Sequence, residues 1–272
     1  MRHWDERLHE TAFRRPLGRH LSGRRYVYRW VDGIYFNVRL SDERPCMLVF
    51  VGVLPDGKKE LVGLLDGERE SKLSWKEFLL DLKRSGLDKG PEVVVADGGL
   101  GFRAALEEVF PGAREERCRV HKTANILDKM PKNIQPSAKR LIQEMNLSPT
   151  KREALGAFDG FLSLYAVKFP KAGLCLEKDK HALFTFYDFP AAHWQYLRTT
   201  NPIEFSFATV RHRARQTKGC GSRTATLSMV SKLAREAEKK WRRLNGCEQV
   251  VKVMTDTPFV DGEEQATQRL AA

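Results

Sequence analysis

The sequence predicts a mixed α/β fold, in which a sheet of antiparallel and parallel strands is covered by helices. Residues 26–40 alternate between apolar and polar residues and are rich in aromatic and β-branched types, which is typical of a strand. The short apolar run Val93–Ala96 is typical of a strand buried on both faces of a sheet. Segments with apolar residues at helical spacing separate the later strands, so helices are expected to pack on the sheet.

The first three strands are expected to form an antiparallel meander. After the strand at residues 26–40, a polar turn leads to the apolar run Cys46–Leu54. The turn signal Pro55-Asp56-Gly57 then precedes a third short strand at residues 58–67.

Helices and strands alternate over the next segment. Ser74 is expected to cap a helix that ends at Gly86 and has four apolar residues on one face: Trp75, Phe78, Leu79 and Leu82. A strand over residues 91–99, a helix over residues 102–110 and a strand over residues 116–121 follow. The order is therefore three strands, a helix, a strand, a helix and a strand.

The remainder is predicted to be mostly helical. Ser148-Pro149 starts a helix that ends before Pro170, and a later helical block from Asn201 is interrupted by two glycines and resumes over residues 224–244. The predicted organisation is a basic lead-in (1–25), the first part of the core (26–121), a helical insertion (122–195), helices that complete the core (196–246) and a polar tail (247–272).

Composition favours a globular protein with a polyanionic partner. The 272 residues include 47 Lys and Arg against 35 Asp and Glu, a net charge of +12, and 42% are hydrophobic, which is enough for a substantial core. Five scattered cysteines without a Cys-x-x-Cys pair argue against a disulfide framework or a four-cysteine zinc site. The first ten residues lack the apolar stretch of a signal peptide, and no apolar run approaches the ~20 residues of a membrane helix. A soluble, cytoplasmic protein is expected.

Three acids stand where a catalytic site is expected. Asp32 follows a strand-like run, Asp97 follows the apolar strand, and Glu204 is at the head of a basic helix. Carboxylates held on strands and a helix suit two divalent metal ions about 3.5–4 Å apart, the arrangement used in phosphoryl transfer. Acids after buried parallel strands are also where α/β sheets place their sites. The order of elements matches a ribonuclease H-like core.

Each acid also has a structural interpretation. Asp32 and Asp97 both precede glycine, and Asp-Gly is a common turn pair. The segment from Asn201 to Glu204 resembles a capping box, in which the glutamate accepts a hydrogen bond from the Asn201 amide. These interpretations stay open at the level of the sequence.

A strongly basic segment follows Glu204. Residues 205–243 contain eleven Lys or Arg against two Glu, although a charged helix is often only a solvated face. At ~100° per residue, Glu204 shares one helical face with Ala208, Arg211 and Arg215. We expect contacts with a nucleic-acid backbone from four side chains: Arg211, Arg213, Arg215 and Lys218.

Three other features carry less weight. Cys118-x-x-His121 lacks the second pair of ligands that a structural zinc site needs. The two side chains are expected to form a half-buried structural pair; alternatively, His121 contacts the scissile phosphate or orders a carboxylate. Trp194 is expected in the core rather than as a platform for a base. The glycine-rich runs lack the fingerprints of a P-loop or a dinucleotide site, so no nucleotide cofactor is expected.

Seven distinctive segments are spread along the chain: YVYRWVDG, KKELVGLLDGERES, VVVADGGLGFRAALEEVFPG, CRVHKTANILDKMPK, FYDFPAAHWQYLRTTNPIE, FATVRHRARQTKGC and EKKWRRLNG. Together they resemble the catalytic part of the Mutator-like bacterial insertion-sequence transposases, from about residue 4 to about residue 247. The resemblance implies a ribonuclease H-like fold with a helical insertion before the glutamate, and metal-dependent cleavage and strand transfer of double-stranded DNA. It implies that Asp32, Asp97 and Glu204 form the metal-binding catalytic triad, and that Cys118 and His121 form the family's Cys-x-x-His element. Two Mg²⁺ ions, for which Mn²⁺ substitutes, a homo-oligomer and association with the bacterial nucleoid are also expected.

The sequence departs from that family at a few positions. A glutamine is usual near Glu116, an aromatic residue is common at Arg119, and a small polar or charged residue is usual at Phe205. Family members usually carry a helical DNA-binding region before the first catalytic acid, and only 31 residues precede Asp32, so that region is expected to be missing. Two alternatives are therefore kept: a truncated, non-autonomous DNA-binding remnant, and a ribonuclease H-like nuclease without strand transfer.

Overall fold

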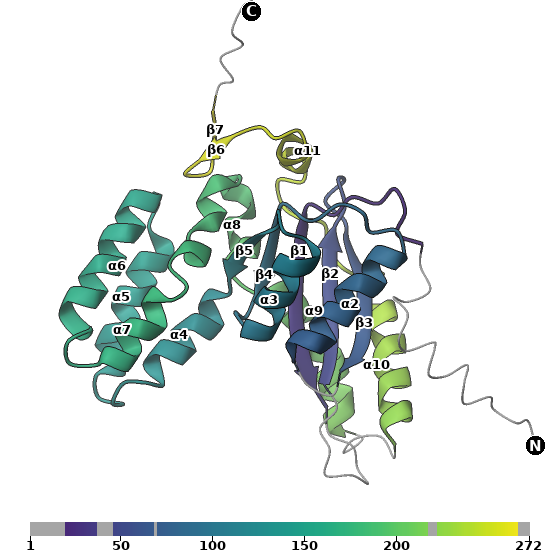
Figure 1. The fold of residues 1–272 in the computed structure, drawn as a ribbon, viewed down its shortest axis with the longest axis horizontal. Helices are drawn as coiled ribbons and strands as arrows, with labels where there is room; N and C mark the ends of the chain where they lie inside the picture. Colours follow the sequence, from purple (N-terminus) through teal and green to yellow (C-terminus); the bar gives the residue numbers. More distant parts are fainter. Residues whose placement is uncertain (1–19, 37–45, 68–69, 217–221, 266–272) are drawn as a thin grey trace, which may run out of the picture.

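A five-stranded mixed sheet is the centre of the fold (Figure 1). The computed structural model describes residues 20–36, 46–67, 70–216 and 222–265, without the side chains of residues 205, 206, 214 and 215. The strands lie in the order β3-β2-β1-β4-β5; β1 to β3 are antiparallel, and β4 and β5 run parallel to β1. Their bounds are β1 Tyr28–Tyr35, β2 Cys46–Val53, β3 Lys59–Gly67, β4 Val93–Ala96 and β5 Arg114–Arg117. The predicted meander and the mixed α/β class are confirmed.

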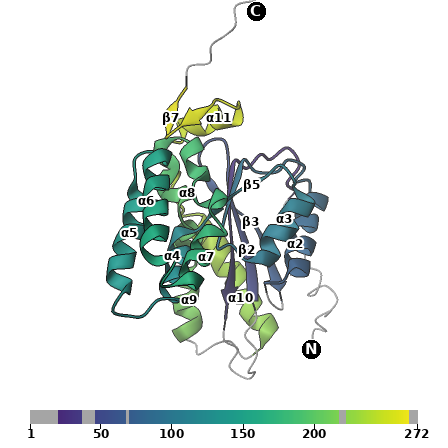
Figure 2. The ribbon, with the colours of Figure 1, turned by 60° about the vertical axis from the view of Figure 1, so that its left-hand side comes forward.

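Helices cover both faces of the sheet (Figures 1 and 2). Helices α2 (Lys72–Arg84) and α3 (Leu100–Val109) lie on one face, and α9 (Asn201–Gln216) and α10 (Arg223–Glu238) lie on the other. The predicted insertion is helical and lies beside α9. Its elements are α4 (Arg119–Leu127), α5 (Gln135–Leu147), α6 (Lys151–Tyr165), α7 (Pro170–Glu177), the 3₁₀ turns His181–Leu183, Thr185–Asp188 and Ala191–His193, and α8 (Trp194–Leu197).

Two predicted boundaries before the insertion are wrong. Ser71 rather than Ser74 caps α2, and its Oγ accepts a hydrogen bond from the Ser74 N–H at 3.1 Å. The strand predicted at residues 116–121 ends at Arg117, because its neighbour β4 has only four residues to pair with. The chain enters α4 directly afterwards.

The C-terminal segment also differs from the prediction. Helix α10 ends at Glu238 instead of residue 244, because the following chain bends back to the sheet, where the Leu244 N–H donates to the Gly57 carbonyl at 2.9 Å. Part of the predicted polar tail is structured as α11 (Glu248–Met254) and a hairpin of β6 (Phe259–Val260) and β7 (Glu263–Glu264). Val250 and Phe259 hold this segment in place, since both are buried in the core. Most of the predicted lead-in lies outside the described residues.

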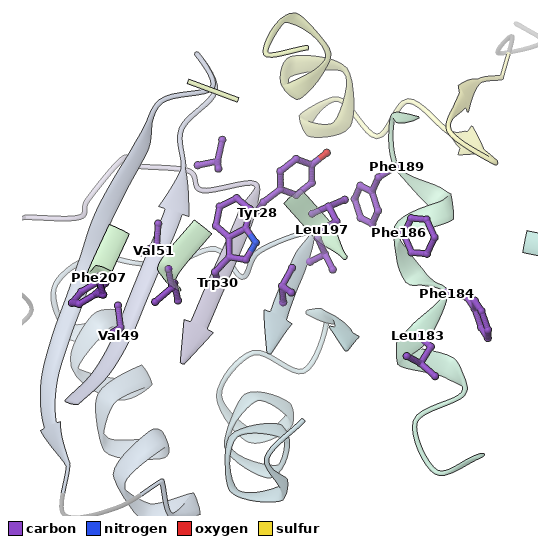
Figure 3. Close-up of a cluster of buried hydrophobic side chains, with 14 of the residues drawn as sticks. Tyr28, Trp30, Val49, Val51, Leu183, Phe184, Phe186, Phe189, Leu197 and Phe207 are labelled. Atoms are coloured by element: carbon purple, nitrogen blue, oxygen red, sulfur yellow. The ribbon is translucent and has the colours of Figure 1, made fainter. Parts of the chain in front are cut away.

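The sheet separates two hydrophobic cores. Because successive side chains of a strand point to opposite faces, Tyr28 and Trp30 of β1 join the core under the insertion and α9, whereas Val31 joins the core under α2 and α3. Figure 3 shows Tyr28 and Trp30 facing Phe186 and Phe189 of the insertion. The same alternation places the next even-numbered residue of β1, Asp32, on the α9 side of the sheet.

Trp194 has the structural role expected for it. Its ring packs on the core edge-on to Phe186 and Tyr187, and its Nε1 donates to the Phe189 carbonyl at 2.9 Å. Within the described ranges no helix has the length and apolarity to cross a membrane. Four cysteines are free thiols, and Cys220 lies outside the described residues.

A buried ion cluster joins the insertion to the sheet. Asp179, shortly after α7, accepts hydrogen bonds from Lys122 Nζ of α4 at 2.7 Å and from Arg117 Nε of β5 at 3.1 Å. Arg103 of α3 adds a third bond at 3.2 Å. The Asp179, Lys122 and Arg117 side chains are all at most 3% exposed, so loss of the carboxylate would leave two cations buried without it.

We predict that Asp179→Asn lowers the free energy of unfolding by about 3–5 kcal/mol, the usual cost of breaking a buried ion pair from one side. The matched control is Asp159→Asn, because Asp159 forms an exposed pair with Lys180 at 3.7 Å and exposed pairs contribute about 1 kcal/mol or less. Urea unfolding of both variants measures the difference. Equal losses in the two variants would contradict a structural role for the Asp179 cluster.

Candidate active site

The register of the parallel strands brings Asp32 and Asp97 together. Strand β1 pairs with β4 so that Trp30 lies opposite Val95, and the same offset, continued by two residues, places Asp97 beside Asp32. Neighbouring strands are about 4.8 Å apart. Both acids also follow the alternation that points Trp30 and Val95 into the core beside α9. The two carboxylates therefore lie on the same side of the sheet, Asp32 within β1 and Asp97 directly after β4.

The turn after β4 fixes the Asp97 side chain. Its Oδ1 accepts a hydrogen bond from the Gly99 N–H at 2.9 Å, so Asp97 does have the turn contact that its alternative interpretation predicts. Gly98 adopts a φ of +79°, which glycine tolerates, and a Cβ there would lie 2.3 Å from Arg117 Nε. The turn thus holds the carboxylate in place and is compatible with a role in a site.

Helix α9 brings the third acid, Glu204, to the side of the sheet where Asp32 and Asp97 lie. Ile203, Phe207 and Val210 are buried against the sheet, whereas the Glu204 side chain remains 34% exposed. The Asn201 N–H, which the capping box would direct to Glu204, donates to Thr199 Oγ1 at 3.3 Å. This contact favours a role for Glu204 other than capping.

Cys118 lies next to Asp97, just after the neighbouring strand β5. Strand β5 pairs with β4 so that Arg117 lies opposite Ala96, and the Cys118 N–H donates to the Ala96 carbonyl at 2.7 Å. This places Cys118 next to Asp97. The thiol is buried, and its Sγ accepts hydrogen bonds from the N–H and the hydroxyl of Thr200, both at 3.4 Å.

His121, one helical turn after Cys118, lies beside Glu204. Its Nε2 lies 3.9 Å from Glu204 Oε1. Contact with the Cys118 side chain raises the pKa of His121 to about 9 against the opposing effect of burial, and the charges of Asp32 and Asp97 add to the rise. The imidazole is therefore a cation at neutral pH, beside the carboxylates. Burial opposes ionisation of the Cys118 thiol, but its contacts with His121 and Thr200 leave its pKa below the ordinary value.

A fourth acid, Glu70, was not identified from the sequence; it lies between β3 and α2. Its carboxylate packs directly on Gly33, where a Cβ would lie 2.1 Å from Glu70 Oε1. Burial, followed by the charges of Asp97 and Asp32, raises the pKa of Glu70 to about 7. In the sequence, Glu70 looks like an ordinary acid just before a helix, and the only clue is that the residue after Asp32 has no side chain.

Asp32 is at the centre of this group of charges. Burial is the main cause that raises the pKa of Asp32 to about 6, and the carboxylates of Asp97 and Glu204 raise it further. His121 and Arg211 act in the opposite direction. The site therefore concentrates negative charge in a partly dry environment, with two cations that offset it incompletely.

The chemistry of the donors fits a hard divalent cation, since Mg²⁺ prefers carboxylate oxygens and needs only one or two of them from the protein. In the part of the chain that the structure describes, no three His, Cys, Asp or Glu side chains are already arranged as a metal site. Burial and the neighbouring carboxylates raise the pKa values of Asp32 and Glu70, so a bound cation would favour the ionised form of both acids.

The basic residues predicted to contact DNA lie on more than one side of α9. The charge of Arg211 acts on Asp32, so this guanidinium lies at the site. Arg213 lines a cavity between α9 and α10, since two residues turn a helix by about 200°. That both side chains contact a nucleic-acid backbone stays a prediction. The side chain of Arg215 and all of Lys218 lie outside the described residues.

Comparisons with known proteins identify the family. Residues 6–244 match the family described as "Transposase, Mutator family". The chain belongs to the Mutator family of transposases. It is 45% identical over 260 residues to the transposase for insertion sequence element IST2 of Acidithiobacillus ferrooxidans, an alignment that covers 96% of this chain and 84% of that protein. It is 46% identical over 244 residues to the transposase for insertion sequence element IS6120 of Mycolicibacterium smegmatis, with coverage of 90% and 75%.

The segment that matches the Mutator family contains the whole candidate site. Asp32, Asp97, Glu204, the Cys-x-x-His pair and Glu70 all lie within residues 6–244. The small C-terminal hairpin lies beyond it. The resemblance in sequence thus coincides with the part of the fold that assembles the acids.

We predict that Asp32→Asn stabilises the protein in metal-free buffer. Asp32 is partly buried and its pKa is raised to about 6, so its ionisation costs stability increasingly as the pH rises from about 4, the pKa in the unfolded chain, to about 6, and the variant should gain about 1–3 kcal/mol at pH 7.5. The gain should shrink as the pH falls from about 6 to about 4 and vanish below that, where the carboxyl is protonated in both folded and unfolded chains.

Thermal and urea unfolding in EDTA measure this gain. The control is Asp88→Asn, since Asp88 is exposed and its change should stay within about 0.5 kcal/mol. A less stable Asp32→Asn variant at pH 7.5 would show that Asp32 is not in an unfavourable electrostatic environment.

Proposed function

We propose that this chain contains the catalytic site of a DNA transposase, which cleaves a DNA strand at the end of an insertion sequence and joins the freed 3′-hydroxyl to a target duplex. Asp32, Asp97 and Glu204 are its catalytic acids. The observation that carries the proposal is the parallel pairing of β1 with β4, in which Trp30 lies opposite Val95. Continued by two residues, this register brings Asp97, just after β4, beside Asp32, and the charge of Glu204 from α9 also acts on Asp32. Membership of the Mutator transposase family supports it.

We also propose that the core is ribonuclease H-like. Support comes from the strand order β3-β2-β1-β4-β5, with three antiparallel strands followed by two strands parallel to β1. The helical insertion between β5 and α9 has the position that this fold class predicts for it in the family.

In the proposed mechanism, Asp32, Asp97 and Glu204 hold Mg²⁺, with two ions expected. When bound, Mg²⁺ supplies activation of the attacking oxygen and neutralisation of charge on the leaving oxygen. The protein's own part is to fix the three carboxylates on two strands and a helix, so that they need not reorganise during the reaction. Glu70 lies near Asp97 and Asp32, whose charges act on it. It is therefore placed to bind a metal ion together with them, or to position their carboxylates.

DNA is the proposed partner, and the positive charges near the site bind its backbone. His121 and Arg211 are the two cations that act on Asp32, and both are placed to meet a phosphate that approaches the acids. Each neutralised phosphate of a duplex contributes about −0.9 to the slope of log affinity against log salt. Contacts of this kind give affinity without reading sequence.

We predict that Asp97→Asn abolishes both cleavage and joining. The amide keeps the size and the turn but loses the charge that holds a hard cation, so activity should fall by more than the roughly 100-fold typical of changes around a metal site. DNA affinity without metal should be unchanged or slightly higher, because a negative charge near phosphate is removed. Denaturing gels with a duplex that carries the element ends measure nicked and joined strands, and Asp88→Asn is the control. Substantial Mg²⁺-dependent activity of Asp97→Asn would remove Asp97 from the site.

Glu204→Gln tests the third acid separately from helix capping. A glutamine can still accept a capping bond, so stability should change by well under the ~1 kcal/mol cost of a lost cap. Activity should nevertheless be lost, whereas Glu144→Gln, an exposed change on α5, should leave it intact. If Glu204→Gln cleaves DNA like the parent, the three-acid site is wrong.

The same gels separate strand transfer from simple nuclease activity. A donor with a pre-cleaved 3′-hydroxyl end should become covalently joined to a supercoiled plasmid in the presence of Mg²⁺. Nicked plasmid without joined product would favour a ribonuclease H-like nuclease, and binding without either product would favour a non-catalytic remnant.

A further inference from the structure

A cavity of about 690 Å³ lies between α9, α10 and the start of β3. Its size falls within the usual range for small-ligand sites, about 300–1,000 Å³. It is on the far side of α9 from the acids, because Arg213 in its wall follows Glu204 by nine residues, which turns the helix by about 180°. It is therefore separate from the candidate active site.

The walls combine positive charge with aromatic rings. Four cations and two aromatic side chains contribute: Lys59, Arg213, Lys240, Arg242, Tyr196 and Trp241. The one acid in the wall, Glu236, is already paired with Lys239 at 2.7 Å. The cavity therefore carries a net positive charge.

The aromatic residues sit among these cations. Lys59 Nζ lies 5.2 Å from the centre of the Tyr196 ring. The Nε1 of Trp241 is buried and has no hydrogen-bond partner among the described residues.

We propose that this cavity binds an unpaired nucleotide of a DNA strand, with its base against Trp241 or Tyr196 and its phosphate near Lys240 and Arg242. Aromatic faces stack on any base, and basic side chains follow the backbone of single strands. A duplex is too wide to enter such a cavity, whereas one extruded nucleotide fits. The inference rests on the proposed function, since it assigns a second contact to the same DNA.

The location agrees with a strand that passes around α9. The helix with its side chains is about 10–12 Å across, which corresponds to about three nucleotides at 3.4 Å each. A strand whose reacting phosphate lies at Asp32 and Asp97 therefore places a nucleotide at least about three positions away in the cavity. Unpairing of the DNA near the cleavage point is the expected consequence.

The first test removes charge from the cavity. Lys240→Gln with Arg242→Gln is compared with Lys132→Gln plus Lys139→Gln, which removes the same charge from exposed positions on the insertion. Anisotropy of a labelled single-stranded oligonucleotide is measured across a salt series in EDTA. Because each single-strand phosphate contact contributes about −0.7 to the slope and both side chains face the same phosphate, the cavity variant should have a slope shallower by about 0.7, and the control variant should match the parent. Equal slopes in the two variants would overturn the proposal.

The second test removes the stacking surface. Trp241→Leu should weaken single-strand binding by about 5- to 150-fold, the range for loss of one stacked base. Trp241→Phe keeps a ring and should restore most of the affinity. Because Trp241 also packs on the core, melting curves confirm that both variants are folded. Loss of affinity that is equal in the leucine and phenylalanine variants would count against stacking.

Duplex DNA separates failure of this inference from failure of the proposed function. The cavity variants should bind a blunt duplex within about twofold of the matched control. If the parent chain cleaves and joins DNA while the cavity variants bind single strands normally, the cavity assignment is wrong and the proposed function stands. If the parent binds neither single strands nor duplex, both are wrong.

Discussion

The parallel pairing of β1 with β4 is the constraint on which the candidate site depends. A one-residue change in that register would move Asp32 or Asp97 to the opposite face of the sheet, because side chains alternate along a strand. The apolar residues that precede each acid prevent this change. Trp30 and Val95 are both fully buried on the α9 side, so the packing of the core and the position of the carboxylates are determined together.

This arrangement of acids costs stability. The site brings Asp32, Asp97, Glu204 and Glu70 near one another, and two of these acids have raised pKa values. His121 and Arg211 offset only part of the repulsion. Other interactions offset this cost. Two hydrophobic cores pack on the two faces of the sheet, and the buried ion pairs of Asp179 stabilise the contact between the insertion and the sheet.

Much of the fold could be predicted from local patterns in the sequence. The strand-like runs before Asp32 and Asp97 predicted β1 and β4. Asn201 was predicted as the start of the basic helix that carries Glu204, and α9 begins there. Features that depend on tertiary contacts could not be predicted in this way. Glu70 belongs to the site only because it packs on Gly33, and the end of α10 is set by a bond to the distant Gly57 carbonyl. Likewise, Arg211 and Arg213 look alike in the sequence, and only the packing of α9 beside α10 on one face of the sheet places Arg211 near Asp32 and Arg213 in the cavity between the two helices.

The most direct test of the account is the position of a divalent cation in crystals of this chain grown with Mn²⁺. Anomalous scattering at the manganese edge locates the ion independently of any assumption about the ligands. The account predicts a peak about 2.0–2.6 Å from carboxylate oxygens of both Asp32 and Asp97, with Glu204 directed to the same region. A manganese ion bound elsewhere, with Asp32 and Asp97 on different faces of the sheet, would contradict it.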